Sequence, residues 1–244
     1  MENQLMFSIG EIEAPDFEEL KNRTIEEEAD ATTYKIMIIG DSSVGKTCLF
    51  KKLTFGIFKD KNVSTIGIDR RTFKVKSDLE EKDGTTKSQL VQINLTDTAG
   101  QERYKSLTKS YYKSSDAAII LYDITDKQSF INIDNWIQSI NASTSQIDKN
   151  TYTIFLMGTK LDLVETGVKE RQVEEDEAQA KCEENNIEWG GECSNKEFTE
   201  EQFKEIFSKF VKIIHKKMGN KPVQQESLKL ANFKKKKKTG KKFC

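Results

Sequence analysis

Eight consecutive residues near the start of the chain have the types and spacing needed to hold phosphate. Residues 40–47 fit the pattern G-x-x-x-x-G-K-[ST] and lie between an apolar run, residues 34–39, and a helical pattern, residues 48–53. Glycines let the backbone wrap an anion closely, and the N–H groups of a helix N-terminus point at it. Lys46 adds a positive charge, and the Thr47 hydroxyl is placed to bind Mg²⁺. The flanking strand and helix favour a nucleoside triphosphate site over a chance glycine-rich turn.

A second group of chemically suited residues follows an alternating run. Asp97 stands where a protein with a phosphate loop takes its second Mg²⁺ contact. Gly100 lets its backbone N–H reach a γ-phosphate, and Gln101 can orient a water for in-line attack. Thr65, in an earlier loop, can contact Mg²⁺ with its hydroxyl and the γ-phosphate with its N–H. Loss of that phosphate would release the Thr65 loop, which makes it a candidate switch.

Two further motifs could recognise a guanine base. The Asp162 carboxylate can accept hydrogen bonds from guanine N1–H and the 2-amino group, a pattern that adenine does not offer. A backbone N–H in the segment around Asn195 can meet the guanine O6. Each motif is weak alone, and their order after a phosphate loop makes the pair specific. The expected base-contacting residues are Thr159, Lys160, Asp162, Ser194, Asn195 and Lys196.

Strands that alternate with helices must position these residues. Apolar or alternating runs predict strands at residues 34–39, 68–77, 89–96, 117–124, 152–157 and 187–193, and helical spacing predicts helices at 48–53, 130–140, 173–182 and 198–214. The charged residues 78–88, which contain Asp-Gly, predict a hairpin with a long tip. This order implies an α/β fold with a six-stranded, mostly parallel sheet, one antiparallel edge strand and helices on both faces. Ligands of such sheets bind at the carboxyl ends of the strands.

The charge distribution divides the chain into three parts. Residues 1–33 hold ten acidic residues against two basic ones, and residues 219–244 hold nine lysines against one glutamate. Between them, residues 34–218 are close to neutral and suit one domain. We expect the acidic N-terminal extension to be disordered and the basic tail to be flexible.

Other features of the sequence limit the function classes. The longest apolar run, residues 117–121, is far shorter than the ~20 residues of a membrane helix. The N-terminus has no signal-peptide pattern, and the four cysteines have no disulfide-framework spacing, which favours the reducing cytosol. The lysine-rich tail has no interleaved aromatics, so we do not expect nucleic acid as a partner.

All these motifs together resemble those of the small Ras-superfamily GTPases, over roughly residues 34–217. The resemblance implies a P-loop GTPase fold and a switch that binds GTP, GDP and Mg²⁺ and hydrolyses GTP slowly. It implies a guanine nucleotide exchange factor, a GTPase-activating protein and a GDP-dissociation inhibitor as partners. Catalytic roles fall on Lys46 and Gln101. The implied nucleotide contacts are Asp41, Ser42, Ser43, Val44, Gly45, Lys46, Thr47, Cys48, Phe58 (packed on guanine), Thr65, Gly100 and the six base-contacting residues, and the implied Mg²⁺ ligands are Thr47, Thr65 and Asp97.

Within that superfamily the chain resembles the Rab branch. Residues 64–69, 103–108, 111–113 and 121–125 are similar to Rab segments, and no Rho-type insert follows Asp162. The resemblance implies effectors at switch I and switch II and a role in vesicle traffic.

Two departures from the Rab pattern concern partner recognition. Rab proteins usually carry Phe and Trp where this chain has Arg70 and Thr96, and with Tyr111 those residues form a triad that effectors contact. Since aromatics dominate interface energetics, we expect altered partner recognition rather than harmless drift. Thr159 replaces the usual Asn, as in Rho relatives. Asn195 replaces the usual Ala, and we expect little effect because the implied contact there is a backbone one.

The C-terminal segment suggests membrane attachment. Lysines precede Cys244, and one isoprenoid chain plus a polybasic stretch is sufficient to anchor a protein to an anionic membrane. Cys244 is therefore a candidate lipidation site, although neither a CC, a CxC nor a C-a-a-X ending is present. The expected location is the cytosolic face of an endomembrane or the plasma membrane, in exchange with the cytosol. Two alternatives to a Rab-like GTPase stay open. One is a Rho- or Ras-type signalling GTPase, and the other is a GTP-bound interaction module with little hydrolysis.

Overall fold

Six strands and six helices have both ends within the residues that the structure describes. The computed structural model describes residues 32–56, 68–81, 83–98, 111–144 and 151–218. The elements are β1 (Thr33–Gly40), α2 (Lys46–Phe55), β2 (Ile68–Glu80), β3 (Thr86–Thr98), β4 (Ala117–Asp123), α4 (Lys127–Ile131), α5 (Ile133–Ser143), β5 (Thr153–Thr159), α6 (Leu161–Glu165), α7 (Glu175–Asn185), β6 (Glu188–Cys193) and α8 (Glu200–Met218). Of the described helices, none has the length and apolar character to cross a bilayer.

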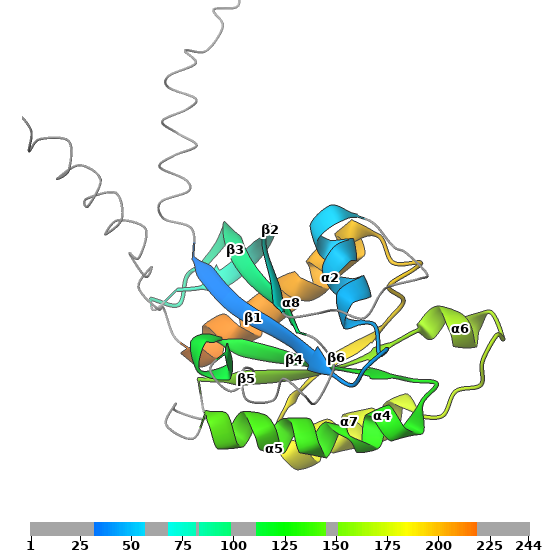
Figure 1. Ribbon diagram of the computed structural model, residues 1–244. Coiled ribbons are helices and arrows are strands. Elements are labelled where there is room, and N and C mark those ends of the chain that lie inside the picture. Colours follow the sequence, from blue (N-terminus) through cyan, green and yellow to red (C-terminus); the bar gives the residue numbers. More distant parts are fainter. Residues whose placement is uncertain (1–31, 57–67, 82, 99–110, 145–150, 219–244) are drawn as a thin grey trace, which may run out of the picture. The chain divides into compact units, whose positions relative to one another are not determined.

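The strands form one sheet in the order β2-β3-β1-β4-β5-β6 (Figure 1). The pair β2–β3 at one edge is antiparallel, and the other pairs are parallel. Every residue of β4 and β5 is buried, as expected of parallel strands covered on both faces. The predicted α/β fold with an antiparallel edge strand is confirmed.

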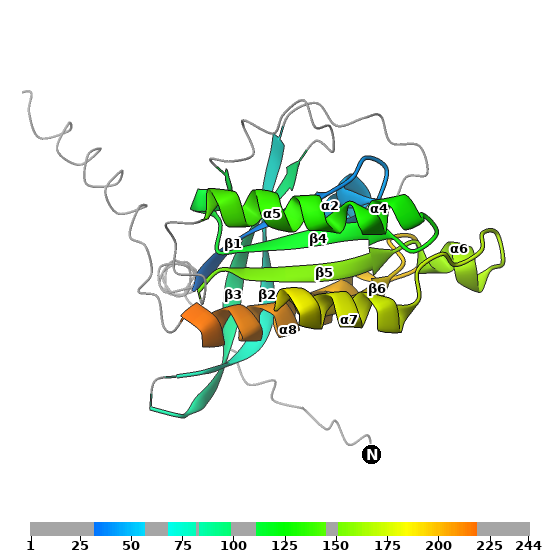
Figure 2. The same cartoon turned by 90° about the horizontal axis from the view of Figure 1, so that it is seen from below.

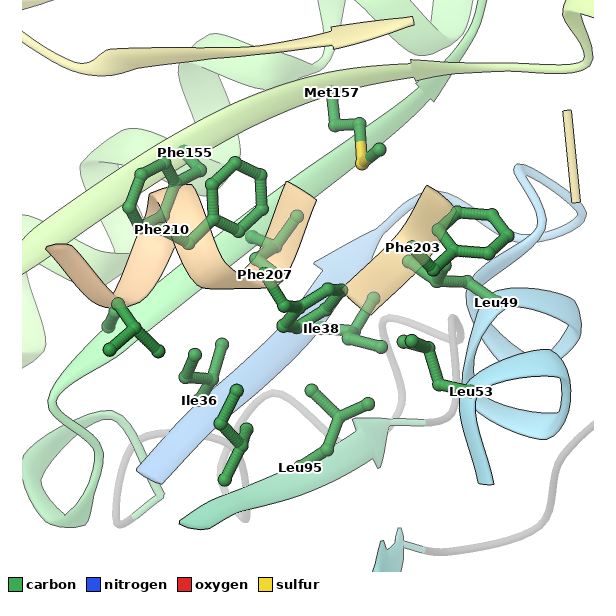
Figure 3. Packing of buried hydrophobic residues seen from close by; sticks show 14 of the residues in the cluster. Ile36, Ile38, Leu49, Leu53, Leu95, Phe155, Met157, Phe203, Phe207 and Phe210 are labelled. Carbon is green, nitrogen blue, oxygen red and sulfur yellow. The ribbon is translucent and has the colours of Figure 1, made fainter. Parts of the chain in front are cut away.

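Alternation along β1 divides the core into two clusters. Ile36 and Ile38 point to the face covered by α2 and α8, whereas Met37 and Ile39 point to the face covered by α5 and α7 (Figures 1 and 2). The aromatic side chains of α8 lie over the strands in Figure 3, where Phe210 stacks on a β5 phenylalanine with ring centroids 4.1 Å apart. The two layers of helices hold the strand ends rigidly at one edge.

The hairpin differs from its prediction. Residues 78–80, predicted to belong to a charged tip, continue β2 and pair with residues 86–88 of β3, so the paired strands extend to Glu80 and Thr86. The reason is long-range packing on α8: Leu79 is buried, and the Ser77 hydroxyl donates to the Ser208 carbonyl at 3.1 Å. Figure 2 shows the hairpin running past α8.

The helices also refine the prediction. The single helix expected over residues 130–140 is two, α4 and α5, which meet at Asn132. The short helix α6, which directly follows β5, was not predicted because its one turn is too short to show a period. The remaining predicted strands and helices are present, with ends shifted by a few residues.

Candidate functional site

The loop between β1 and α2 needs glycine at both ends. Gly40 has φ 136°, and a Cβ there would lie 2.3 Å from the Leu121 carbonyl oxygen. Gly45 has φ 100°, and its Cβ would lie 2.7 Å from the Asn195 Nδ2 atom. Any larger residue would push the loop away from β4 or from the segment after β6. The backbone therefore turns tightly around the point where α2 begins.

The start of α2 is built to receive an anion. Gly45 is the N-cap, and no side chain among the described residues hydrogen-bonds the start of the helix. The positive end of the helix dipole thus faces the loop without an internal carboxylate or hydroxyl over it. A phosphate group at this position would supply the negative charge that the helix end favours.

Lys46 places a buried ammonium inside this loop. Its side chain is 5% exposed, and Nζ donates to the Asp41 carbonyl at 2.5 Å. Burial lowers the pKa of Lys46 to about 8, and the charges of Asp97 and Asp41 act in the opposite direction. An ammonium held this way gains most from a second anionic partner, which a phosphate would provide.

The Asp41 carboxylate faces the helices α4 and α5 and not the loop interior. Its Oδ2 accepts from Asn132 Nδ2 at 2.6 Å, and its Oδ1 accepts from Trp136 Nε1 at 2.8 Å. Asp41 is one of the predicted nucleotide contacts in the loop. Its side chain instead holds the loop against Asn132 and Trp136. The sequence did not predict the contacts with Asn132 and Trp136. An apolar helical pattern does not show which acceptor the indole N–H of a tryptophan will reach.

The other residues of the loop lie as follows. Val44 is buried in the core, and Cys48 is half-buried on α2. Ser42 and Ser43 are exposed, and Ser43 has φ 66°, which is uncommon for a residue with a side chain. Such a conformation turns successive N–H groups toward one concave side, as anion-binding backbone nests do.

Thr47 and Asp97, which the sequence predicts as Mg²⁺ ligands, are in hydrogen-bond contact. The Thr47 hydroxyl donates to Asp97 Oδ2 at 2.7 Å, and Asp97 Oδ1 is buried without a hydrogen-bond partner among the described residues. Burial raises the pKa of Asp97 to about 6, opposed by the Thr47 hydrogen bond and the Lys46 charge. An unpartnered buried carboxylate oxygen beside a hydroxyl fits Mg²⁺, a hard cation that prefers oxygen ligands and takes few of them from protein.

Asp162 and Ser194, which the sequence predicts as base-contacting residues, meet at the carboxyl ends of β5 and β6. The Ser194 hydroxyl donates to Asp162 Oδ1 at 2.8 Å and accepts from the N–H groups of Lys196 and Glu197. Asp162 is 9% exposed. Its carboxylate is thus fixed in orientation, with Oδ2 available to a ligand edge. The predicted motifs around Asp162 and Ser194, which are 32 residues apart, are brought together.

Thr159 and Lys160 connect the segment before Asp162 to the phosphate loop and to β4. The fully buried Thr159 hydroxyl lies 2.7 Å from the Val44 carbonyl oxygen, so the end of β5 is tied to the phosphate loop. Lys160, at φ 67°, forms an ion pair with Asp123 Oδ2 at 2.6 Å. Asp123 is buried at the end of β4 and also accepts from Thr125. Sequence reasoning missed Asp123, although its position after an apolar strand was a usable signal.

Asn195 makes a contact that the sequence did not predict. Its Nδ2 atom donates to the Gly45 carbonyl at 3.1 Å, and the residue is 6% exposed. The usual alanine could not make this bond. Together with the Thr159 hydroxyl, the Asn195 amide joins the base-recognition segment to the phosphate loop.

The altered aromatic positions lie together on the edge of the sheet. Arg70 and Thr96 are cross-strand partners on β2 and β3. The Arg70 guanidinium carbon lies 4.8 Å from the centre of the Tyr111 ring, a cation–π contact. Three positions that the sequence grouped are therefore neighbours.

Several predicted site residues lie outside the described residues. They are Phe58, Thr65, Gly100, Gln101 and Cys244. The acidic segment up to residue 31 and the basic tail from residue 219 also lie outside them.

Comparison with known proteins gives consistent results. The family model described as the Ras family matches residues 35–216. The chain is 40% identical over 132 residues to GTP-binding protein yptV2 of Volvox carteri, an alignment covering 54% of each chain. It is 39% identical over 148 residues to GTP-binding protein YPT1 of Saccharomyces cerevisiae, covering 60% of this chain and 65% of that one. It is 41% identical over 132 residues to Ras-related protein Rab-19 of Xenopus laevis, covering 54% and 56%. The aligned part thus spans somewhat more than half of each relative.

Proposed function

The chain belongs to the Ras family, and we propose that it is a Rab-like small GTPase that binds GTP and GDP with Mg²⁺ and hydrolyses GTP to GDP. The relatives named as Rab or GTP-binding proteins support this branch. The observation that carries the proposal is that Asp162 and Ser194 hydrogen-bond each other while their sequence neighbours Thr159 and Asn195 hydrogen-bond the phosphate loop. One ligand with a guanine at one end and phosphates at the other would span both.

Guanine selectivity follows from the Asp162 carboxylate. Since Ser194 holds Oδ1 at 2.8 Å, the carboxylate presents acceptors to the ligand edge and no donor. Guanine offers two donors there, N1–H and the 2-amino group, whereas adenine offers none at the matching positions. A base whose edge leaves a buried carboxylate unpaired is strongly disfavoured.

Hydrolysis would rest on residues of the phosphate loop and switch II. Lys46 stabilises negative charge that builds up on the transferred phosphoryl group, and Gln101 orients the attacking water. Thr47 and Asp97, with Thr65, would hold Mg²⁺. When bound, the ion neutralises charge on the β- and γ-phosphate oxygens. In-line attack by water on the γ-phosphorus then breaks its bond to the bridging oxygen, which leaves with GDP.

Regulators, effectors and membrane attachment complete the proposal. An exchange factor, a GTPase-activating protein and a GDP-dissociation inhibitor would act on the nucleotide cycle, with effectors at the switch segments. Cys244 would carry a lipid that holds the chain at the cytosolic face of a membrane in vesicle traffic. Replacement of Cys244 by serine should shift a tagged chain from the membrane fraction to the soluble one.

Nucleotide selectivity provides the main test. We expect the full chain to bind a fluorescent GDP at least ~100-fold more tightly than the matching ADP, since a mismatched edge costs ~3 kcal/mol or more. Asp162→Asn presents an N–H donor and should reverse the preference toward xanthine nucleotides, which have a carbonyl at position 2. Asp176→Asn, an exposed change in the first turn of α7, is the control. Equal binding of GDP and ADP would contradict the proposal.

Hydrolysis is tested separately. Single-turnover experiments with and without cell extract should show extract-stimulated conversion of GTP to GDP by the full chain. Gln101→Leu should bind GTP normally and lose the stimulation. Tight GTP binding without stimulated turnover in either protein would instead support the interaction-module alternative.

A further inference from the structure

A groove lined by residues of β1, β2, β3 and the segment before β4 lies apart from the residues that bracket the phosphate loop. It has a volume of about 360 Å³, within the range of ~300–1,000 Å³ typical of ligand sites. Three of its eight lining residues are basic, Lys35, Arg70 and Arg71, and the other five carry hydroxyl or amide groups. No acidic residue lines it among the described residues. A groove of this composition favours a negatively charged occupant.

The uncharged groups of the groove also favour an anion. The Thr72 hydroxyl donates to Asn94 Oδ1 at 2.7 Å, which uses the amide oxygen and leaves the Asn94 NH₂ group with no partner among the described side chains. The Ser115 hydroxyl donates back to the Tyr111 carbonyl at 2.8 Å. The groove therefore offers N–H donors from an oriented amide beside its cations, which a carboxylate can accept.

The side-chain cations of Lys35 and Arg70 form no ion pair among the described residues, although the backbone N–H of each donates to a carboxylate, Asp116 Oδ2 and Asp69 Oδ1, both at 2.8 Å. The Arg70 guanidinium is instead held 4.8 Å from the Tyr111 ring centre. Arg71 lies 3.9 Å from Asp69 and over the Phe55 ring, so it contributes less. The stacked Arg70 is restrained but still has its donors, which lowers the entropic cost of binding a carboxylate.

The distance between these cations distinguishes a peptide from a single small anion. Lys35 on β1 and Thr72 on β2 both pair with Asn94 on the intervening strand β3. Neighbouring strands are ~4.8 Å apart, so the two outer backbones are roughly 10 Å apart. Arg70 is displaced by a further two positions along β2. Two carboxylates of an extended chain would match this separation, with one carboxylate at each end.

We propose that this groove binds an acidic segment of a partner protein, with one carboxylate on Arg70 and a second toward Lys35. The inference rests on the proposed function, because the partner would be an effector of the proposed GTPase and the groove would set the chemistry of the segment it binds. An extended chain advances ~3.3 Å per residue, so the two acidic residues of the partner stand roughly three or four positions apart.

Peptide selection tests the chemistry before any partner has been identified. Random peptides of about 12 residues, displayed on phage, are selected on the full chain loaded with a non-hydrolysable GTP analogue. We expect enrichment of Asp and Glu at the stated spacing. The best peptide is then synthesised and its affinity measured by fluorescence anisotropy. Arg70→Glu should weaken it about tenfold or more, and Lys76→Glu, an exposed change on the same strand outside the groove, less than about twofold.

The outcomes separate this inference from the proposed function. Nucleotide content is measured on every preparation. A chain that binds no guanine nucleotide contradicts the proposed function, while an acidic consensus sensitive to Arg70 would still support the groove. A nucleotide-loaded chain that selects apolar or basic peptides, or none, overturns the acidic-segment assignment alone. So does Arg70-dependent binding of anionic phospholipid vesicles or of nucleic acid without any acidic peptide.

Discussion

Replacement of Asn195 by alanine tests whether the contact between the base segment and the phosphate loop controls nucleotide release. The amide Nδ2 donates to the Gly45 carbonyl at 3.1 Å and is almost fully buried. Alanine removes this donor and introduces no new polar group. For the nucleotide to leave, the two segments must part, so the bond opposes release.

The expected magnitude is modest and can be worked from the contacts. A buried hydrogen bond between uncharged groups contributes ~1 kcal/mol net. The Gly45 carbonyl keeps the Leu49 N–H at 2.9 Å, so the variant leaves no unpaired carbonyl and no added penalty. Lowering the barrier to release by ~1 kcal/mol accelerates dissociation about fivefold.

Stopped-flow release of fluorescent GDP into excess unlabelled GDP measures this rate. Asn135→Ala, an exposed change on α5, is the matched control and should leave the rate within about twofold. Urea unfolding of the same proteins separates the two roles. Lower stability with an unchanged release rate would show that Asn195 is only structural and would refute the reasoning.

Three further predictions concern stability. Gly45→Ala should destabilise the chain more than Gly167→Ala in urea unfolding, since both have positive φ but only the Gly45 Cβ meets a neighbour, at 2.7 Å; equal effects would contradict this. Trp136→Phe should cost ~2 kcal/mol, because the indole N–H donates to a carboxylate at 2.8 Å, and an unchanged urea midpoint would count against that bond. Burial raises the pKa of Tyr112 to about 12, so the folded state keeps the phenol neutral while the unfolded chain ionises near pH 10. The Tyr112 contribution to stability should therefore be intact below pH 10 and fall between pH 10 and 12, with ~1.4 kcal/mol lost at pH 11 in urea unfolding that Tyr112→Phe retains.

The sequence predicted those parts of the site that local pattern determines. The phosphate loop, Asp97 and Asp162 each stand at the end of an apolar strand, and parallel strands bring their carboxyl ends to one edge. The approximate positions of most helices and strands followed from apolar periodicity in the same way.

The parts that could not be predicted depend on contacts between distant residues. Trp136 and Asp41 are 95 positions apart, and Asn195 and Gly45 are 150 apart. Helical spacing predicts that Trp136 faces inward. It does not predict which acceptor the Trp136 indole N–H will contact. The extension of β2 to Glu80 likewise depends on α8, which follows more than a hundred residues later. Residues 78–80 have the charged composition of a turn. Their strand conformation can be recognised only when the helix that covers Leu79 is known.

The hydrogen bond from Trp136 to Asp41 gives the chain an optical signal of its own. Indole emission responds to the charge and rigidity of its surroundings, and this indole donates at 2.8 Å to the side-chain carboxylate of Asp41, a residue of the phosphate loop. The other tryptophan, Trp189, contacts the exposed Glu175 on α7, away from that loop. Ultraviolet excitation of the unlabelled chain would therefore report nucleotide arrival through Trp136, with Trp189→Phe as the variant in which that emission is seen alone.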